Sequence, residues 1–399
     1  MSMKRNLAAA ALALLGLAMG PAAGLAQDKI TIGAVLIDAG PMAAYYERSN
    51  NALKLAVDQV NAGGGIDGRP LELKIATHAG TPEAAVSAAM RLRQQDGARI
   101  ITGMTGSAMA IALAARAKVA DYVLFDPFSQ TDILNGKNCH RNYFRVSTPD
   151  ALINNGMEAV VAASPASRFD IIASDHPAGH DSAASFAALL ERHGKSSNPP
   201  IFVPAGTPDM GSFIIPMKSS DADGAMVAIF GTDAVNFAVQ QQGFGLFGKY
   251  KQVIGNGFAT PATLPSQGAG VEGVIQLLGW TPEIDTPENK AFVQAYRDAF
   301  GSDPDYVAAD QYNAIQLIAA GLRAAGTDEA GPLVSALEGK VVATTFGPTE
   351  VRAQDHQLVR PLTVNEVVKN DDGSMGYRLE RVLAADEAKP APSPDCTLK

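Results

Sequence analysis

Short apolar runs alternate with amphipathic helical patterns along the first third of the chain. The run 30–36 is β-rich and almost wholly apolar, which is typical of a strand buried on both faces. A helical pattern follows and ends at three successive glycines, and alternating apolar positions at 71–75 predict a second strand. Thr81 and Pro82 then have the order of a helix N-cap and a first helical residue. This regular β-α-β-α series over 28–126 predicts a doubly wound parallel sheet, which belongs to the α/β class.

A second series with the same alternation follows a predicted strand at 143–146. Because no linker separates the two α/β units, the pattern predicts a bilobed protein with a cleft between the lobes. After the second series come two long helices and a β-hairpin around the turn 370–373. The expected strands are 169–173, 201–203, 225–230, 252–254, 274–278, 358–368 and 377–382, and the expected helices are 181–193, 233–242, 287–300 and 305–325.

One stretch of the first unit, 99–131, brings polar residues to a single edge of the predicted sheet. Its two strands flank a helix at about 108–120, so both strands end at the edge where open α/β sheets bind small molecules. Ser107 stands at the N-cap position of that helix, where free backbone N–H groups favour a carboxylate. The alternative is a tight turn in which Ser107 only caps its helix. The candidate ligand-binding residues at this edge are Thr105, Ser107, Phe128, Ser129 and Gln130.

Loops at the other expected strand ends also carry hydroxyl, amide and aromatic side chains. Such groups fix a small polar ligand by hydrogen bonds and stacking, and they include no evident nucleophile with its base. We therefore expect a shared binding cleft and no enzymatic activity. The further candidate residues are Tyr45, Asp175, Thr232, Asp233, Asn256 and Phe258.

Motifs for catalysis or cofactor binding are weak in this chain. Gly255-Asn256-Gly257 follows a predicted strand but lacks the third glycine of a dinucleotide fingerprint, so no cofactor is expected. The segment 175–181 contains two aspartates and two histidines, which are residue types that bind metals. A metal bound there would indicate an exported enzyme. We favour the alternative for this segment, a strand-to-helix loop with Asp181 or Ser182 as the cap, and expect no metal.

The N-terminus has the pattern of a cleaved secretory signal. Lys4 and Arg5 precede an apolar run at 7–19, and small residues follow up to Ala26. A membrane anchor is the alternative, but this run is short for a membrane span of about 20 residues. Cleavage near Ala26 leaves 30 basic and 41 acidic residues. The resulting net charge of −11 attracts neither nucleic acid nor an anionic membrane surface.

The chain has two cysteines, Cys139 and Cys396, and both lie in the part expected to be exported. Disulfides persist in exported proteins, so we expect the two to pair and to pin the C-terminal tail to the end of the first lobe. The alternative is two unrelated thiols.

Several segments resemble those of a known family. The run 30–33, then Ala39-Gly40-Pro41, Tyr45 and the stretch 56–71 resemble the opening of the type I periplasmic solute-binding proteins. The branch that looks nearest contains the leucine/isoleucine/valine-binding proteins of ABC importers. Three further stretches also resemble this family, namely 138–145, 306–313 and 346–357.

This resemblance implies two lobes joined by three crossover segments, near 145–147, 278–281 and 346–349, with a hinge movement that closes them around a ligand. The implied N-terminal lobe comprises 27–146 and 280–346. The implied C-terminal lobe comprises 147–279 and 347–385, and 386–399 form a C-terminal tail.

The resemblance carries over only part of the family's binding site. Ser107 matches the serine that holds the ligand carboxylate in the amino-acid binders, and Tyr45 matches an aromatic residue of the first lobe at the cleft. Phe128 and Gln130 fall where those binders present a small residue and a threonine.

The second lobe departs from the family's pattern. Asn256-Gly257-Phe258 stands where the amino-acid binders place a glutamate against the ligand ammonium, and Ala178-Gly179 replaces their usual Tyr-Gly. A buried ammonium without an anionic partner is costly, unless Asp175 or Asp233 substitutes. A small carboxylate, an amide or an aromatic solute therefore remains as compatible as an amino acid.

Together these patterns predict a monomeric periplasmic receptor that closes on a small organic solute and delivers it to an ABC permease in the inner membrane. Two alternatives remain open at this point. One is a ligand-sensing module of a signalling system, because the same fold serves that use. The other is an exported enzyme that uses the segment 175–181.

Overall fold

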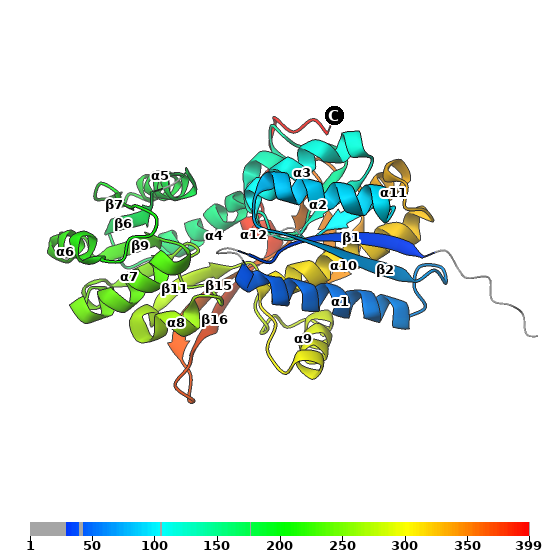
Figure 1. Ribbon diagram of the computed structural model, residues 1–399. Helices are drawn as coiled ribbons and strands as arrows, with labels where there is room; N and C mark the ends of the chain where they lie inside the picture. The colour runs from blue at the N-terminus through cyan, green and yellow to red at the C-terminus, as the bar shows by residue number, and fades with distance from the viewer. Residues whose placement is uncertain (1–28, 40–42, 104–105, 176, 399) are drawn as a thin grey trace, which may run out of the picture.

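The computed structural model describes residues 29–39, 43–103, 106–175 and 177–398. It consists of two lobes, each with helices on both faces of a central sheet (Figure 1). The α/β class predicted from the alternating pattern is thereby confirmed. The expected signal peptide lies outside the described residues. Within these ranges, no helix combines the length and the apolar character that crossing a bilayer requires.

The first lobe is built on five parallel strands in the order β2-β1-β3-β4-β5. Because successive strand residues face opposite sides, Ile32 packs with helices α1 and α10 on one face, while Val35 packs with α2 and α3 on the other. The elements are β1 (Ile30–Ile37), α1 (Tyr46–Ala62), β2 (Leu71–His78), α2 (Pro82–Gln95), β3 (Ile100–Thr102), α3 (Ser107–Ala120), β4 (Val123–Asp126), η2 (Asp132–Asn135), β5 (Tyr143–Arg145), α9 (Pro287–Phe300), α10 (Tyr306–Ala325) and α11 (Ala330–Leu337).

The second lobe is built on a larger sheet, in which β16-β15-β11-β10-β9-β6-β7 follow one another and β8 also pairs with β6. Its strands are parallel except for β15 and β16, which form the predicted C-terminal hairpin. The elements are α4 (Asp150–Ala163), β6 (Arg168–Ser174), α5 (Pro177–Arg192), β7 (Ser196–Ser197), β8 (Ile201–Val203), α6 (Gly211–Ser219), β9 (Gly224–Ala228), α7 (Gly231–Phe244), β10 (Gln252–Gly255), α8 (Leu264–Gln267), β11 (Val274–Leu278), β15 (Leu362–Lys369), β16 (Met375–Leu383) and α12 (Ala385–Ala388).

Two of the predicted helix starts need correction by the structure. Thr81 caps α2 as expected, because its hydroxyl accepts a hydrogen bond from the Ala84 N–H at 3.2 Å. In contrast, Gly106 is the N-cap of α3, and Ser107 is the first residue of that helix. Helix α5 already begins at Pro177, so Asp181 and Ser182 lie inside it and cap nothing.

The third crossover lies further along the chain than the sequence indicated. Strands β13 (Gly347–Val351) and β14 (Leu358–Val359) pair with β12 (Val341–Thr344) in a small antiparallel sheet. Val351 and Leu358 are buried in the core that α10 forms with the first sheet. Residues 347–359 therefore pack with the first lobe, and the chain crosses to the second lobe at 360–361 and not near 346–349.

A single buried arginine connects the three crossovers. Arg360 stands on the third, and its guanidinium donates to the carbonyl oxygens of Val146 on the first and Gly279 on the second, both at 2.8 Å. It also pairs with the buried carboxylate of Asp310 on α10, at 2.5 Å. A Cβ at position 279 would lie 2.1 Å from the Thr148 hydroxyl oxygen, so the close approach of the crossovers requires glycine there.

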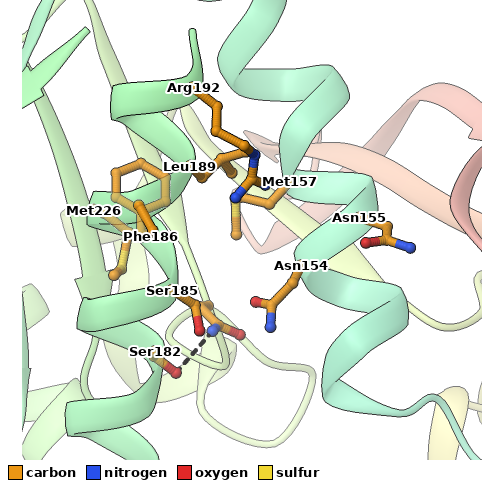
Figure 2. Close-up of a pocket in the computed structure, with 11 residues that line it drawn as sticks. Asn154, Asn155, Met157, Ser182, Ser185, Phe186, Leu189, Arg192 and Met226 are labelled. Atoms are coloured by element: carbon orange, nitrogen blue, oxygen red, sulfur yellow. Dashed lines mark hydrogen bonds between the residues drawn. The ribbon is translucent and has the colours of Figure 1, made fainter. Parts of the chain in front are cut away.

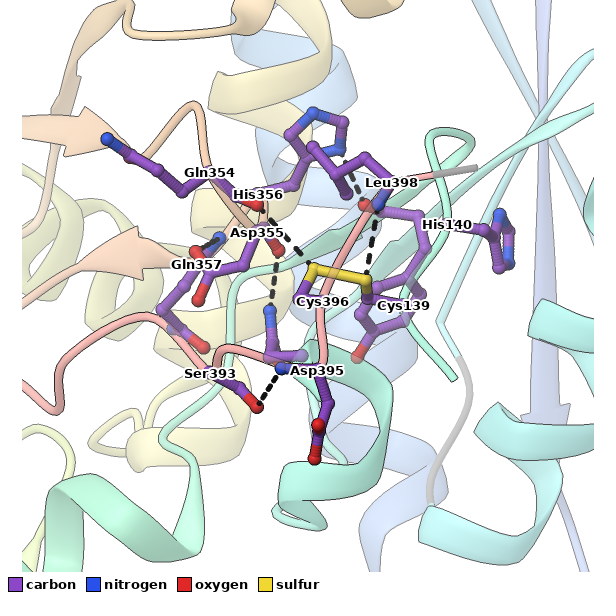
Figure 3. Close-up of a disulfide and its surroundings, with 12 residues drawn as sticks. Cys139, His140, Gln354, Asp355, His356, Gln357, Ser393, Asp395, Cys396 and Leu398 are labelled. Carbon is purple, nitrogen blue, oxygen red and sulfur yellow. Dashed lines mark hydrogen bonds between the residues drawn. A yellow bond between two sulfur atoms is a disulfide. The ribbon is translucent and has the colours of Figure 1, made fainter. Parts of the chain in front are cut away.

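The C-terminal tail is fastened to both lobes. Cys139 and Cys396 form the predicted disulfide, with Cα atoms 5.4 Å apart, and this bond joins the end of the tail to the first lobe (Figure 3). Before it, α12 packs on α4 of the second lobe, where Ala388 is buried, and Arg352 donates to the Pro390 carbonyl oxygen at 2.6 Å. The tail therefore has further anchors besides the disulfide.

Candidate functional site

A cavity of about 790 Å³ lies between the lobes, at the carboxyl ends of the strands of the first lobe. The first lobe contributes Ser107, Gln130 and Asp132 to its wall, and the second lobe contributes Asp150, Asp181 and Asn256. The predicted approach of the two loops of the first lobe is confirmed, because the Gln130 N–H donates to the Ser107 hydroxyl oxygen at 3.4 Å.

Ser107 forms a corner of this cavity that suits a carboxylate. It is the first residue of α3, so the unpaired N–H groups of the first helical turn and the positive end of the helix dipole lie beside it. The Ser107 oxygen accepts from Gln130, which leaves its hydroxyl hydrogen free to donate to a bound anion.

The loop that carries Gln130 is held by a buried polar network. One carboxylate oxygen of Asp126, at the end of β4, accepts from the N–H groups of Phe128 and Ser129 at 3.0 and 2.9 Å, and the other accepts from Tyr143 at 2.7 Å. The Ser129 hydroxyl also bonds to Asp126, and Ser129 is only 1 % exposed. Ser129 thus positions the loop in this structure and does not present its hydroxyl to the cavity.

Three of the carboxylates that line this cavity lie together, and Gln130 links them to the Ser107 corner, because its carbonyl oxygen accepts from the Asp150 N–H at 2.8 Å. Asp150 begins α4, Asp181 lies on α5, and Asp132 accepts from the Ala151 N–H at 3.1 Å. Burial raises the pKa of Asp150 to about 7; the charges of Asp132 and Asp181 add to this, and Arg145 opposes it. A cation bound here would relieve the repulsion, so this acidic corner suits an ammonium group.

A smaller cavity of about 50 Å³ lies deeper between the lobes, next to the crossovers. Phe128 and Tyr306 line it, and the Tyr45 ring meets Phe128 edge to face with centroids 5.3 Å apart. Burial raises the pKa of the Tyr45 hydroxyl, and the hydroxyl groups of Tyr306 in the first lobe and Thr260 in the second partly offset this shift. Tyr45 therefore lies near residues of both lobes on this aromatic side of the cleft.

Five candidate residues therefore lie at the cleft, because Ser107, Phe128, Gln130 and Asn256 line its cavities and Tyr45 contacts Phe128. Thr105 lies outside the described residues. The acids Asp132, Asp150 and Asp181 were not among the candidate ligand-binding residues. For Asp150, the sequence offered one indication of a place at the cleft: it follows Pro149, shortly after the first crossover.

Four candidates of the second lobe do not reach these cavities. Asp175 pairs with His180 at 2.8 Å, Asp233 accepts from the Gly206 N–H at 2.9 Å, and Thr232 precedes Asp233 in the exposed first turn of α7. Phe258 is fully buried in the core of the second lobe.

The segment 175–181 does not assemble a metal site in the described part of the chain. The His180 ring stacks on Phe202, with centroids 3.8 Å apart, and pairs only with Asp175 among possible ligands. No three side chains of metal-ligand type lie close enough together among the described residues to hold a metal ion. His176 falls outside them.

Comparison with known proteins gives the family. The sequence profile described as periplasmic binding protein matches residues 29–373. The Leu/Ile/Val-binding protein homolog 4 of Brucella abortus (strain 2308) is 24 % identical over 423 residues, which cover 100 % of this chain and 98 % of that protein.

Solved structures show the same fold. An ABC transporter substrate-binding protein from Sphaerobacter thermophilus matches with a TM-score of 0.82 and 27 % identity, covering 90 % of this chain and 98 % of that one. A solute-binding protein of an ABC transporter from Rhodopseudomonas palustris BisB5 was solved in complex with 3,4-dihydroxybenzoic acid. It matches with a TM-score of 0.80 and 24 % identity, covering 90 % of this chain and 98 % of that one. The resemblance found in the sequence is confirmed, and the chain belongs to the periplasmic binding protein family.

Proposed function

We propose that this protein captures a free α-amino acid between its lobes and releases it unchanged. The observation that carries this proposal is that the Ser107 corner and the acidic corner around Asp150 line one cavity. A zwitterion has a carboxylate and an ammonium group close together, and these two corners complement both charges.

The acidic corner also answers the objection that the sequence raised. Burying an ammonium group is costly without an anionic partner, and the glutamate of the amino-acid binders is absent at Asn256. Asp150 comes from the first turn of α4 and Asp181 from the N-terminal half of α5, both in the second lobe, and they supply the missing negative charge.

The transport role follows from the family. We propose that the mature, monomeric protein works in the periplasm and delivers its solute to an ABC permease of the inner membrane. The name of its Brucella relative, a leucine/isoleucine/valine-binding protein homologue, supports amino acids as the solute class.

An aromatic carboxylate is the second candidate solute. Phe128 and Tyr306 line the deeper cavity, and the Rhodopseudomonas protein with the same fold was solved with 3,4-dihydroxybenzoic acid. The acidic corner separates the two candidates, because it attracts an ammonium group and repels a second carboxylate.

A first test removes the hydroxyl at the carboxylate corner. A thermal-shift screen of L-amino acids and aromatic carboxylates first selects the strongest ligand, since a ligand of the native state raises the melting temperature. We expect Ser107→Ala to weaken that ligand by about 1–2 kcal/mol in calorimetry, because a hydrogen bond to a charged group is lost. Ser87→Ala, in an exposed turn of α2, is the control. Unchanged affinity of Ser107→Ala would remove this corner from the site.

A second test uses the pH dependence of amino-acid binding. The raised pKa of Asp150, about 7, means that this carboxylate is charged at pH 8 and mostly protonated at pH 5.5. A solute ammonium gains no charge over this range, so we expect the affinity for L-leucine to fall as the pH falls. Asp150→Asn is expected to bind weakly at both pH values, whereas Asp58→Asn, exposed on α1, is expected to behave as the wild type.

The same variant distinguishes the two solute classes. If the solute is an aromatic carboxylate, Asp150→Asn binds benzoate more tightly than the wild type does, because a repelling charge is gone. That result, together with no binding of amino acids, would contradict the proposed function.

A further inference from the structure

A further cavity opens from the cleft into the second lobe, between α4 and α5 (Figure 2). Its volume is about 290 Å³. Asn154, Ser182, Ser185 and Asn256 line both this cavity, which we call the α4–α5 pocket, and the interlobe cavity. The Asn256 amide donates to the Ser182 hydroxyl oxygen at 3.1 Å, and these shared polar residues form the mouth of the pocket.

The floor of the α4–α5 pocket is apolar. Met157 of α4, Phe186 and Leu189 of α5, and Met226 of β9 line it, and each is at most 3 % exposed. From Ser182 to Leu189 the helix rises by about 10 Å, so the pocket is long enough for an extended side chain. A hydrocarbon chain that enters this pocket leaves water, and burial of its apolar surface is favourable.

A cationic side chain stands at the far end. Arg192 is the last residue of α5, and Figure 2 shows its guanidinium reaching over the pocket between Leu189 and Met157. Its carboxylate partner, Glu158, is 3.6 Å away, and the Arg192 side chain is 57 % exposed. The Arg192 guanidinium therefore has N–H groups that can donate to a hydrogen-bond acceptor on a solute in the pocket.

We propose that the α4–α5 pocket receives the side chain of the bound solute. The solute class is then an α-amino acid with an extended, mostly apolar side chain that ends in a carboxylate or another hydrogen-bond acceptor. This inference rests on the proposed function, because the acids that hold the ammonium group stand at the mouth of the same pocket.

The order of groups along the two helices supports this assignment. Asp150 lies about one helical turn before Asn154 on α4, and Asp181 directly precedes Ser182 on α5; the apolar floor follows, and Arg192 ends the series. A solute that matches this order has its positive charge first, then a hydrocarbon chain, then an acceptor.

The test is a calorimetric series with three probes on the full mature protein. We expect L-2-aminooctanoate to bind at least about tenfold more tightly than L-alanine, because its chain covers the apolar floor. L-2-aminosuberate, which adds a terminal carboxylate, is expected to bind more tightly than L-2-aminooctanoate because of Arg192.

Variants at three positions locate the gain within the α4–α5 pocket. Ala188 lines this pocket and not the interlobe cavity, so Ala188→Phe is expected to abolish the gain from chain length and to leave L-alanine binding unchanged. Glu191→Phe, exposed on the same helix, is its control. Arg192→Gln is expected to remove the preference for L-2-aminosuberate, and Arg192→Lys to keep most of it.

The outcomes separate this inference from the proposed function. Equal affinity of the wild type for L-alanine and L-2-aminooctanoate would overturn the pocket assignment, while amino-acid binding itself would stand. The same conclusion would follow if Ala188→Phe, folded as judged by circular dichroism, weakened all three probes equally. If none of the three probes binds to the wild type, the proposed function fails and the assignment falls with it.

Discussion

Arg360→Met is expected to lower the free energy of unfolding by about 3–5 kcal/mol at pH 8, because it leaves the buried carboxylate of Asp310 without its partner. It also removes the donor that the carbonyl oxygens of Val146 and Gly279 share. Burial, partly offset by Arg360, raises the pKa of Asp310 to about 7. Removing Arg360 raises this pKa further, so Asp310 of the variant takes up a proton more readily and the unpaired charge disappears as the pH falls. We therefore expect a smaller loss at pH 6 than at pH 8.

Urea denaturation, monitored by tryptophan fluorescence, measures this effect close to the crossovers. Trp280 is the only tryptophan of the chain, is 1 % exposed and directly follows Gly279 on the second crossover. Arg378→Met is the matched control, because Arg378 forms its ion pairs with Glu366 and Glu380 on the exposed hairpin, and we expect no measurable change there. If Arg360→Met unfolds at the same urea concentration as the wild type, the arginine does not hold the crossovers together.

Replacing both cysteines, Cys139→Ser with Cys396→Ser, is expected to lower the free energy of unfolding by about 2–5 kcal/mol. The disulfide closes a long loop, with a sequence separation of 257 residues, and its loss leaves the unfolded chain many more conformations. Ser393 and Asp395 of the tail also line the interlobe cavity, so we expect weaker solute binding in the same variant.

A reducing agent provides the control for this variant. Reduction is expected to destabilise the wild type to the level of the double variant and to leave the double variant unchanged. Equal denaturation midpoints for the wild type and the double variant, without reductant, would show that the bond adds nothing to stability.

Much of the fold was predictable because its signals are local. The Thr-Pro pairs at 81 and 286 start helices through contacts within one turn, and both threonine hydroxyls accept from the N–H three residues on. Apolar runs such as 30–36 are long enough to identify buried strands without knowledge of their neighbours.

The third crossover was misplaced because its position depends on pairing and not on local pattern. The strands β13 and β14 alternate in the same way whichever lobe they join. Their pairing with β12 and the burial of Val351 and Leu358 beside α10 decide the question.

The site was half predictable for a similar reason. The rule that parallel strands end at one edge placed Ser107 beside Gln130, and the structure brings them together. Asp150 and Asp181 were missed because their place in the cleft depends on how α4 and α5 are oriented. Phe258 was assigned to the cleft, but Gly257, with φ of 67°, turns the chain so that this ring packs into the core.

The central claim is that two lobes close on a solute held between them. Small-angle X-ray scattering of the protein, with and without a saturating concentration of its strongest ligand, tests this claim most directly. The account predicts a smaller radius of gyration with the ligand, because hinge closure about the three crossovers brings the lobes together. Identical scattering curves in the two conditions would contradict it.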